Sequence, residues 1–295
     1  MDIRVLRYFL AVTKARNFTA AAEALHVTQP TLSKQMKELE EDLGKQLLIR
    51  GSRQVSLTED GQVLRKRAIE IIDLIDRTTA EIRKPDGVIG GSIYIGGGES
   101  ASMRLITQVM RELQDQHPDI QFHLYSGIAD DVKERIDTGL LDFGVVIGST
   151  NTENYDFRVL PEVDRWGLLV PADSPLANLS TIQAEELKDL PLISSHQALN
   201  ENELTGWFGD DFNQLNIVAT YNLIYNASLM VEAGIGYALC LDKLVDTYAL
   251  NSLKFVPLEP ALTSQLKIIW KKQNSFSTAA KAFHTNLHDK LNELG

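Results

Sequence analysis

Apolar side chains along residues 20–40 recur with the spacing of two short helices separated by a polar turn. The second predicted helix carries a single apolar stripe at i, i+4, i+7 and i+11, formed by Leu32, Met36, Leu39 and Leu43. Thr28 precedes it as a suitable N-cap, and Pro30 falls in the first turn, where a missing N–H costs nothing. This pattern is typical of a helix-turn-helix.

The polar face of the second helix carries the side chains that a DNA-reading helix needs. Short polar groups lie near its N-terminal tip, where they can reach base edges, and lysines follow where they can attract phosphates. The candidate DNA-binding residues on this helix are Gln29, Pro30, Thr31, Ser33, Lys34 and Lys37. An ordinary solvated helix face has a similar pattern, so this helix alone leaves both interpretations open.

The flanking segments favour the DNA-binding interpretation. Upstream, a stripe of Leu6, Phe9, Leu10 and Thr13 predicts a third packed helix, and Phe18-Thr19 is expected to cap the alanine-rich helix. Downstream, residues 47–58 contain two short β-prone runs around a turn at Gly51-Ser52, which predicts a hairpin wing. Arg50 and Arg53 on this wing are candidates for phosphate or minor-groove contact.

A long helix is predicted between Thr58, its N-cap, and Pro85-Asp86-Gly87, which end it. Its apolar positions follow a 4-3-4-3-4 spacing and form a heptad seam, made of Leu64, Ala68, Ile71, Ile75, Thr78 and Ile82. Such a seam predicts a homodimer through this helix. The alternative is a helix whose apolar face lies on its own domain. We favour dimerisation because charged residues surround the seam.

The remainder of the chain alternates predicted strands and helices, which indicates an α/β domain. The first set contains strands at 91–98, 120–126 and 141–148, with helices at 100–116 and 130–138 between them, so a parallel sheet is expected. The second set contains strands at 166–171, 191–195 and 237–241 and a helix near 226–233. A strand at 266–272 and a helix at 277–294 are expected to return to the first set. Crossovers near Leu160 and Ser264 would then separate two subdomains by a cleft.

These features together resemble the LysR-type transcriptional regulators. The matching residues are Ala20 to Ala22, Val27-Thr28-Gln29-Pro30, Ser33-Lys34, Leu39-Glu40, Leu43-Gly44, Arg50, Arg53, Leu57-Thr58 and Gly61, followed by Leu141 to Val145, Gly234 to Gly236 and Ala238-Leu239. Three positions depart from the family pattern: Leu48 replaces an aromatic residue, Asp60 a small residue and Leu241 a frequent proline. The resemblance implies a linker helix that dimerises, a homotetramer with contacts between effector domains, and a periplasmic-binding-protein-like effector domain of two Rossmann-like subdomains.

The expected domain boundaries follow from this organisation. A winged helix-turn-helix domain occupies 1–57 and a linker helix 58–87, and the effector-binding domain is divided into subdomain I, 88–160 with 265–295, and subdomain II, 161–264. Residues 1–84 hold 15 basic and 12 acidic side chains, whereas the remainder holds 14 and 28, so the net charge of −11 resides in the larger part. This asymmetry suits a small DNA reader joined to an acidic body.

Strand ends of the predicted effector domain supply the candidate ligand groups, since ligands bind outside the carboxyl ends of parallel strands. The helix expected to open at Ser100 offers free N–H groups and could bind a carboxylate. The candidate effector-binding residues are Ser100, Ala101, Ser102, Ser126, Gly148, Ser149, Thr150, Ser195, His196, Tyr225 and Asn226. The alternative for the serines is that they merely cap the helix.

Other chemistry finds little support in the sequence. Gly96, Gly98 and Ala101 spell a GxGxxA, but the next strand ends without the acid that would bind a ribose, so no nucleotide cofactor is predicted. Ser195-His196 lack a partner acid, and the histidines lack metal-ligand spacing, so neither catalysis nor a metal is expected. Cys240, the only cysteine, lies in an apolar run and is expected to be a buried thiol.

The sequence thus predicts a cytoplasmic regulator that binds double-stranded DNA at an inverted-repeat operator and senses a small, carboxylate-bearing effector. No signal peptide or membrane-spanning segment is expected. The competing interpretation is an enzyme or a solute-binding protein with an accessory helix-turn-helix domain. An enzyme would show turnover, whereas a regulator would show salt-sensitive, site-specific DNA binding.

Overall fold

The computed structural model describes residues 1–51, 54–83, 88–148, 150–200, 202–245, 252–273 and 275–294. The chain forms two compact units, Met1–Asp86 and Gly87–Gly295. Within the described ranges, no helix is long and apolar enough to cross a membrane.

Three helices form the core of the first unit: α1 (Ile3–Ala15), α2 (Phe18–Ala24) and α3 (Gln29–Leu43). The predicted N-cap of α3 is confirmed, because the Thr28 hydroxyl accepts a hydrogen bond from Thr31 N at 3.3 Å. The sequence predicted the cap of α2 at Phe18-Thr19, one residue after its actual position. Asn17 caps this helix, and its side-chain oxygen accepts from Thr19 N and Ala20 N.

The α1–α2–α3 core largely follows the predicted stripes. Leu32, Met36 and Leu39 of α3 are buried against Phe9 and Val12 of α1, together with the small side chains of α2. The prediction for Leu43 is wrong, since this side chain is 41% exposed. The reason is that α3 ends there: Gly44 takes a left-handed conformation with φ +64°, which turns the chain away from the core.

The predicted wing is confirmed as an antiparallel pair of strands, β1 (Leu48–Arg50) and β2 (Val55–Leu57). Glu40 of α3 holds the start of β1 in place, because one of its carboxylate oxygens accepts from Leu47 N at 2.8 Å and from Leu48 N at 2.9 Å. Gly61 is required beneath the wing, since a Cβ there would lie 2.1 Å from the Leu47 carbonyl oxygen. Leu48 is buried, so it packs where the family usually places an aromatic residue.

Helix α4 (Glu59–Ile82) begins at its predicted cap, Thr58, whose hydroxyl accepts from Gly61 N. The predicted seam divides into two parts. Leu64 and Ala68 face their own domain, where they pack with Ile72 against Leu6 of α1. For these positions the alternative interpretation of the sequence is therefore the correct one. The predicted helix end at 85–87 lies outside the described residues.

Four exposed apolar side chains of α4 lie on one side of the helix, beside the stripe that packs on α1. They are Val63 at 65% exposure, Ile71 at 37%, Leu74 at 41% and Ile82 at 78%. Ile69 is also exposed, but it lies on the opposite side of the helix. Ile71, Thr78 and Ile82 of the predicted seam are exposed, and Ile75 is half-buried. This face is what the described part of α4 offers to a partner.

The second unit opens with the expected βαβαβ arrangement: β3 (Gly91–Gly97), α5 (Met103–Gln116), β4 (Ile120–Ser126), α6 (Ala129–Asp137) and β5 (Phe143–Ile147). The predicted parallel pairing is confirmed, because β3 pairs in parallel with both β4 and β5. Helix α5, however, begins at Met103 rather than at Ser100, and its N-cap residue Ser102 makes no side-chain capping bond.

Two long strands connect the halves of this unit. β6 (Tyr155–Pro171) pairs along its first part with β11 (Thr263–Lys271), and its last part pairs with β9 (Tyr237–Leu241) and β10 (Leu253–Pro257), all antiparallel. The sequence predicted only the end of β6, from Trp166. In its first part, apolar and polar residues alternate from Tyr155 to Val159, but Leu160-Pro161 interrupts the pattern. Phe157, Val159 and Val163 are exposed.

The second half is completed by the parallel strands β7 (Leu192–Ser195) and β8 (Ile217–Tyr221), which gives the strand order β4-β3-β5-β11-β6-β9-β7-β8. Strands β8 and β10 were missed by the sequence analysis. Its helical elements are η1 (Pro175–Asn178), α7 (Ala184–Leu187), α8 (His196–Asn200), α9 (Asn202–Phe208), η2 (Gly209–Gln214) and α10 (Ile224–Glu232). The closing helix α11 (Thr278–Leu294) returns to the first half, as predicted.

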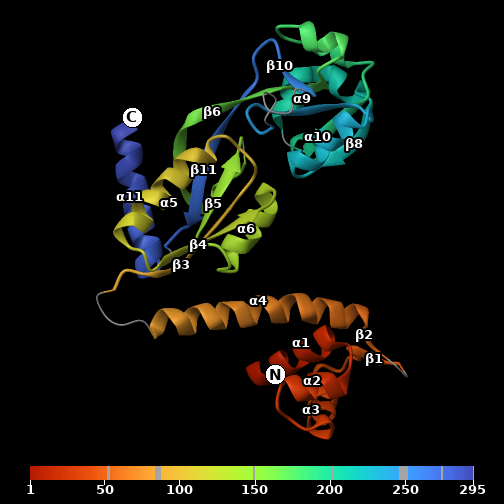
Figure 1. The fold of residues 1–295 in the computed structure, drawn as a ribbon, viewed down its shortest axis with the longest axis vertical. Helices are drawn as coiled ribbons and strands as arrows, with labels where there is room; N and C mark the ends of the chain where they lie inside the picture. Colours follow the sequence, from red (N-terminus) through yellow and green to blue (C-terminus); the bar gives the residue numbers. More distant parts are fainter. Residues whose placement is uncertain are drawn as a thin grey trace. The chain divides into compact units, whose positions relative to one another are not determined.

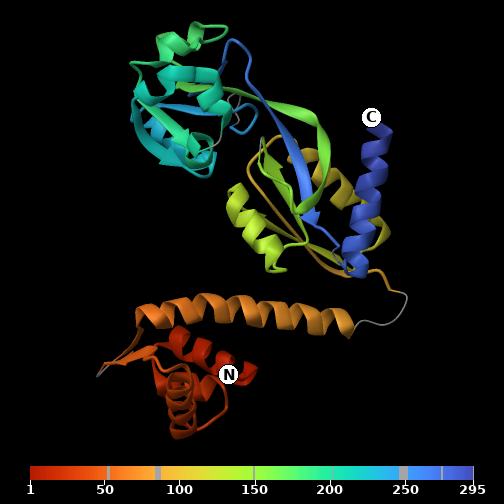
Figure 2. The same ribbon diagram turned by 180° about the vertical axis from the view of Figure 1, so that it is seen from behind.

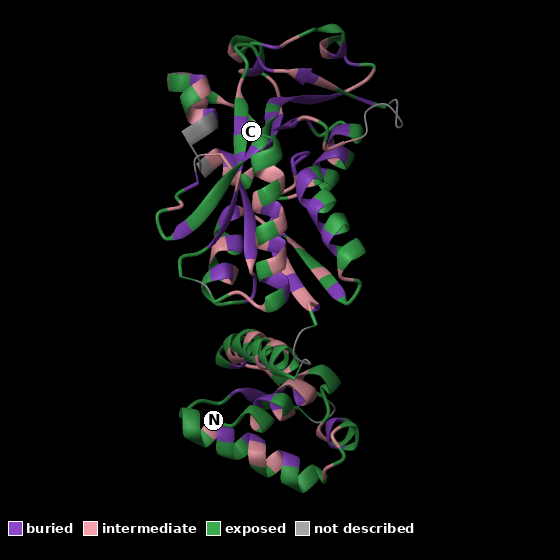
Figure 3. Ribbon diagram, turned by 90° about the vertical axis from the view of Figure 1, so that its left-hand side faces the viewer, coloured by how far each residue is buried: buried purple, intermediate pink, exposed green. Residues whose placement is uncertain are grey.

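Helices cover both faces of the first half of the sheet (Figures 1 and 2). Alternation along β5 explains the two layers: Phe143 and Val145 pack against α5 and α11, and Val146 packs against α6. The strand centres are accordingly buried, whereas α11 keeps an exposed outer side (Figure 3). Gly96 of the GxGxxA sequence has a packing role, since a Cβ there would lie 2.4 Å from Leu141 Cδ1.

Candidate functional sites: a DNA-reading helix and a cleft between two half-sheets

The tip of α3 presents the predicted DNA-reading side chains to solvent. Gln29, Pro30 and Thr31 are exposed in its first turn. The side chains of Lys34 and Lys37 are 76% and 73% exposed and form i,i+4 ion pairs with Glu38 at 3.6 Å and Glu41 at 3.4 Å. Such exposed pairs contribute little to stability, so both lysines can exchange a carboxylate for a phosphate at small cost.

Ser33 and Arg50 contact each other across the helix and the wing. Arg50 Nη1 donates to Ser33 Oγ at 3.0 Å, and its guanidinium lies 5.0 Å from the ring centre of Phe18 and 3.9 Å from a Glu40 oxygen. The guanidinium is therefore fixed in place beside the reading helix. Arg53, the other predicted wing contact, lies outside the described residues.

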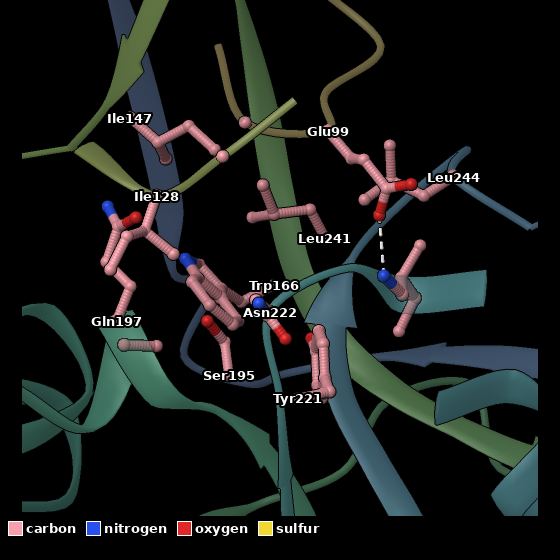
Figure 4. A pocket seen from close by; sticks show the side chains of 14 residues that line it. Glu99, Ile128, Ile147, Trp166, Ser195, Gln197, Tyr221, Asn222, Leu241 and Leu244 are labelled. Atoms are coloured by element: carbon pink, nitrogen blue, oxygen red, sulfur yellow. Dashed lines mark hydrogen bonds between the residues drawn. The ribbon is translucent and has the colours of Figure 1, made fainter. Parts of the chain in front are cut away.

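A pocket lies in the second unit where its two half-sheets meet. About 540 Å³ of space there, which includes the opening to solvent, is not filled by atoms. Strand ends and helix starts from both halves form its walls (Figure 4). The lining residues are Gly98, Glu99, Gly127, Ile128 and Ile147 from the first half, and Trp166, Ser195, Gln197, Ala198, Tyr221, Asn222, Ile224, Leu241 and Leu244 from the second. This is the cleft that the sequence analysis expected between two α/β halves.

Hydrogen bonds between described residues cross the cleft at two places. The Glu99 carboxylate follows β3 and accepts from Ile224 N, in the first turn of α10, at 2.5 Å (Figure 4). Gln197 of α8 accepts through Oε1 from Ala129 N, at the start of α6, at 3.1 Å. In each bond, a side chain of one half accepts from a backbone N–H in the first turn of a helix of the other half, where such N–H groups have no partner within the helix. The two halves are therefore joined at the pocket by side chains that a ligand can reach.

The aromatic walls have their polar atoms already satisfied. Trp166 Nε1 donates to Ser264 Oγ at 2.7 Å, and the Tyr221 hydroxyl donates to the Leu239 carbonyl oxygen at 2.7 Å. Burial raises the pKa of Tyr221 well above its usual value, and Cys240 and Glu99 act in the same direction. Both side chains thus present neutral, largely apolar surfaces to the pocket.

The hydroxyls of Ser100 and Ser102 make hydrogen bonds within the protein. The Ser100 hydroxyl accepts from Ser102 N at 3.0 Å, and the Ser102 hydroxyl donates to buried Asp164 at 3.4 Å. Burial raises the pKa of Asp164, the Ser100 hydroxyl opposes this shift, and the charge of Asp242 adds to it. Oδ2 of Asp164 accepts no hydrogen bond from the described residues. Both serines are buried, and neither lines the cleft pocket.

The other predicted effector residues are distributed over several places. Ser195 lines the cleft pocket, whereas Ser100, Ala101 and Ser126 line a second hollow, which also contains Arg104 and Lys243. Gly148 N donates to the Gln265 carbonyl, and Thr150 is buried with its hydroxyl on the Ile147 carbonyl. Ser149 lies outside the described residues.

Three further predicted residues face solvent instead of the pocket: His196, Asn226 and Tyr225, which is 68% exposed. For Tyr225 and Asn226 the reason is the position of α10. It begins at Ile224, so that Ile224 and Ala227 face the sheet while the side chains between them face outward. The sequence analysis missed Tyr221 and Asn222 because it missed β8, at whose end they lie. Glu99, which was not among the predicted residues, directly precedes the predicted Ser100.

Metal and thiol chemistry find no support in the described part of the chain. No group of three or more His, Cys, Asp or Glu side chains is arranged there to hold a metal ion. Cys240 is buried in β9, as predicted, and burial together with Asp242 raises its pKa to about 12. A thiol with such a pKa stays protonated and unreactive at neutral pH.

Comparison with known proteins identifies the class defined by this combination of reading helix and cleft. The model of the bacterial regulatory helix-turn-helix proteins of the lysR family matches residues 3–62, and that of the LysR substrate binding domain matches residues 86–292. The chain therefore belongs to the LysR family of bacterial transcriptional regulators.

Individual relatives agree with this assignment along nearly the whole chain. The Hca operon transcriptional activator HcaR of Escherichia coli (strain K12) is 30% identical over 92% of both proteins. An HTH-type regulator, YwbI of Bacillus subtilis (strain 168), is 32% identical over 96% of this chain and 94% of its own length. Full-length CbnR, crystallised with its target DNA, has the same fold, with a TM-score of 0.74 at 20% identity, and the match covers 98% of this chain and 100% of CbnR.

The predicted family, fold class and functional class are thus confirmed. The protein is a DNA-binding transcriptional regulator with a domain for a small-molecule effector. The competing interpretation as an enzyme is excluded, because the relatives are transcriptional regulators.

Proposed function

We propose that the cleft pocket between the two half-sheets is the effector site and that α3 with the wing reads DNA. The observation that carries the proposal is that residues from both halves line one pocket and exchange hydrogen bonds across it. A ligand bound there contacts both halves, so it can favour one relative orientation of them over another. Binding of effector and binding of DNA are then coupled.

The proposed DNA contacts divide by chemistry. Gln29, Pro30, Thr31 and Ser33 are placed at the tip for base edges, and Lys34, Lys37, Arg50 and Arg53 for phosphates. Support comes from the exposure of the α3 tip and of both lysines. Two such heads in a symmetric dimer favour an operator with inverted half-sites.

Assembly is proposed through the exposed face of α4. Ile71, Leu74 and Ile82 would pack against a second copy of the chain, because a partner helix would bury these three exposed apolar side chains. A homotetramer built by contacts between effector domains and a cytoplasmic location complete the proposal. The boundaries at 57/58, 87/88, 160/161 and 264/265 stay predictions.

The carboxylate expected on the effector also stays a prediction. Of the residues proposed to bind it, Ser100, Ala101 and Ser126 line the second hollow, where Arg104 and Lys243 supply positive charge. Ser102, Gly148, Ser149, Thr150, His196, Tyr225 and Asn226 do not line the cleft pocket as described. Of the predicted effector-binding residues, Ser195 is the one that lines the cleft pocket as described.

A fragment screen by ligand-observed NMR on the full chain tests the location of the effector site. Ser195→Phe would fill the pocket, so fragments that bind in the cleft should lose their binding to this variant. Tyr225→Phe removes only a hydroxyl from a side chain that is mostly exposed and serves as the control. If the fragments that bind the wild type bind Ser195→Phe equally well, the effector site lies elsewhere.

A further inference from the structure

The cleft pocket has an unusual charge for a site expected to bind a carboxylate. Among the described residues that line it, Glu99 carries the only formal charge. The residues of 88–295 outside the description contain no Lys, Arg or His that could offset this charge. The remaining polar lining groups are the neutral side chains of Ser195, Gln197, Tyr221 and Asn222. The charge on the lining of the cleft pocket is therefore negative. Glu99 also lines the second hollow, whose lining includes Arg104 and Lys243, and neither of these cations lines the cleft pocket.

Glu99 is placed where a ligand can pair with it. One carboxylate oxygen accepts from Ile224 N, and the carboxylate can accept several further hydrogen bonds. Glu99 and Leu244 lie on one side of the pocket, Ile128, Ile147 and Gln197 lie on the other, and Trp166 lies between them (Figure 4). The pocket thus combines one anionic end with an apolar body.

This arrangement discriminates between ligands by charge. A carboxylate that enters the pocket would lie beside the Glu99 carboxylate in a partly desolvated space, where like charges repel strongly. An ammonium group would instead form a charge-assisted hydrogen bond with Glu99. A neutral ligand would leave the Glu99 charge with its hydrogen bond from Ile224 N but without a cation, which is costly once the ligand excludes water.

We propose that Glu99 determines effector specificity, and that the cleft selects small molecules that place an ammonium or amidinium group on Glu99 and an apolar body against Trp166. The inference rests on the proposed location of the effector site. It concerns the end of the ligand that faces Glu99, so a carboxylate elsewhere in the same molecule, on the Ser100 side, is compatible with it.

Calorimetric titration of the full chain with three probes that share a phenyl body tests the inference. The probes are 2-phenylethylamine, 2-phenylethanol and 3-phenylpropionate. Glu99→Gln removes the charge but keeps an oxygen that can accept from Ile224 N, so the cleft should keep its shape. Glu162→Gln, at an exposed position of β6, removes the same charge away from the pocket and is the matched control.

The wild type and Glu162→Gln should bind the amine at least about tenfold more tightly than the carboxylate. Glu99→Gln should weaken amine binding by about 10- to 100-fold and should strengthen binding of the carboxylate. Equal affinities for amine and carboxylate in the wild type, an equal loss of both in Glu99→Gln, or no saturable amine binding in the millimolar range would overturn the inference.

A blocked pocket separates this inference from the proposed function. Ser195→Phe, or Asn222→Phe should the first variant fail to fold, should abolish binding of every probe. Abolished binding together with equal affinities for amine and carboxylate contradicts the role of Glu99 but keeps the effector site in the cleft. Probe binding that persists in a folded blocked variant contradicts both.

Discussion

Arg50 of the wing donates a hydrogen bond to Ser33 of the reading helix at 3.0 Å. The sequence assigned these residues to separate tasks, with Ser33 at base edges and Arg50 at phosphates. Their contact makes them one unit, because the hydroxyl that would face a base also holds the guanidinium that would face the backbone. The position of the wing relative to α3 depends on this bond and on the Glu40 carboxylate beneath it.

Ser33→Ala and Arg50→Ala are therefore expected to be non-additive in their effect on DNA affinity. A double-mutant cycle should give a coupling energy of about 0.5–3 kcal/mol, as for residues in one hydrogen-bonded network. Lys37→Ala with Arg50→Ala is the control pair, since Lys37 pairs with Glu41 instead. Additive losses for Ser33 and Arg50 would show that their contact has no role in binding.

Lys34→Ala should weaken binding to every duplex and reduce the slope of log affinity against log salt by about 1, because one phosphate contact is lost. Gln29→Ala should leave the slope unchanged and relax sequence choice by about 1–3 kcal/mol at one base pair. Fluorescence anisotropy with specific and random duplexes at several salt concentrations measures both effects. Lys281→Ala, at an exposed position of α11, should change neither.

Ile71→Glu with Leu74→Glu should separate the subunits of the dimer, since two carboxylates would be buried in the helix pair formed by the exposed face of α4. Ile69→Glu, on the opposite side of the same helix, should leave the assembly intact. Sedimentation velocity distinguishes these results. A dimer that survives the double substitution but dissociates with Ile69→Glu would place the interface on the other face.

Asp164 should make the effector domain less stable as the pH rises. Burial raises its pKa in the folded state above the usual value of 3.8, so the stability that its neutral form contributes is present below pH 3.8. This contribution is lost as the pH rises through the raised pKa. Asp164→Asn should therefore raise the melting temperature at neutral pH, by about 2–4 °C for each kcal/mol recovered, and by less near pH 4. Equal differences at both pH values would contradict the assignment.

Local sequence rules were sufficient for elements with a strong period and good caps. The stripe of α3, its Thr28 cap and the parallel pairing of β3 with β4 and β5 are confirmed. The first part of β6 was not predicted, because the alternation of apolar and polar residues from Tyr155 to Val159 stops at Leu160-Pro161. Phe157 and Val159 are moreover exposed, so this alternation does not mark a buried face.

Tertiary packing decided the rest. The heptad spacing of α4 includes Leu64 and Ala68, but these pack on Leu6, so the spacing alone could not tell the domain core from an interface. At the cleft, the strand-end rule identified the loop after β3 but not which side chain enters the pocket. Ser102 donates to Asp164 of β6, whereas Glu99 lies at the wall of the pocket, an outcome that depends on contacts distant in sequence.

The most direct test of this account measures the coupling between the cleft and the reading helix. DNA affinity is determined with and without a cleft ligand identified by the NMR screen, and the affinity for that ligand is determined with and without a duplex selected from a random library. We expect the affinity for DNA and the affinity for the ligand to change by the same factor, typically 5- to 150-fold, and Ser195→Phe to abolish the change. A ligand that occupies the cleft fully and leaves DNA affinity and DNA site spacing unchanged would contradict this account.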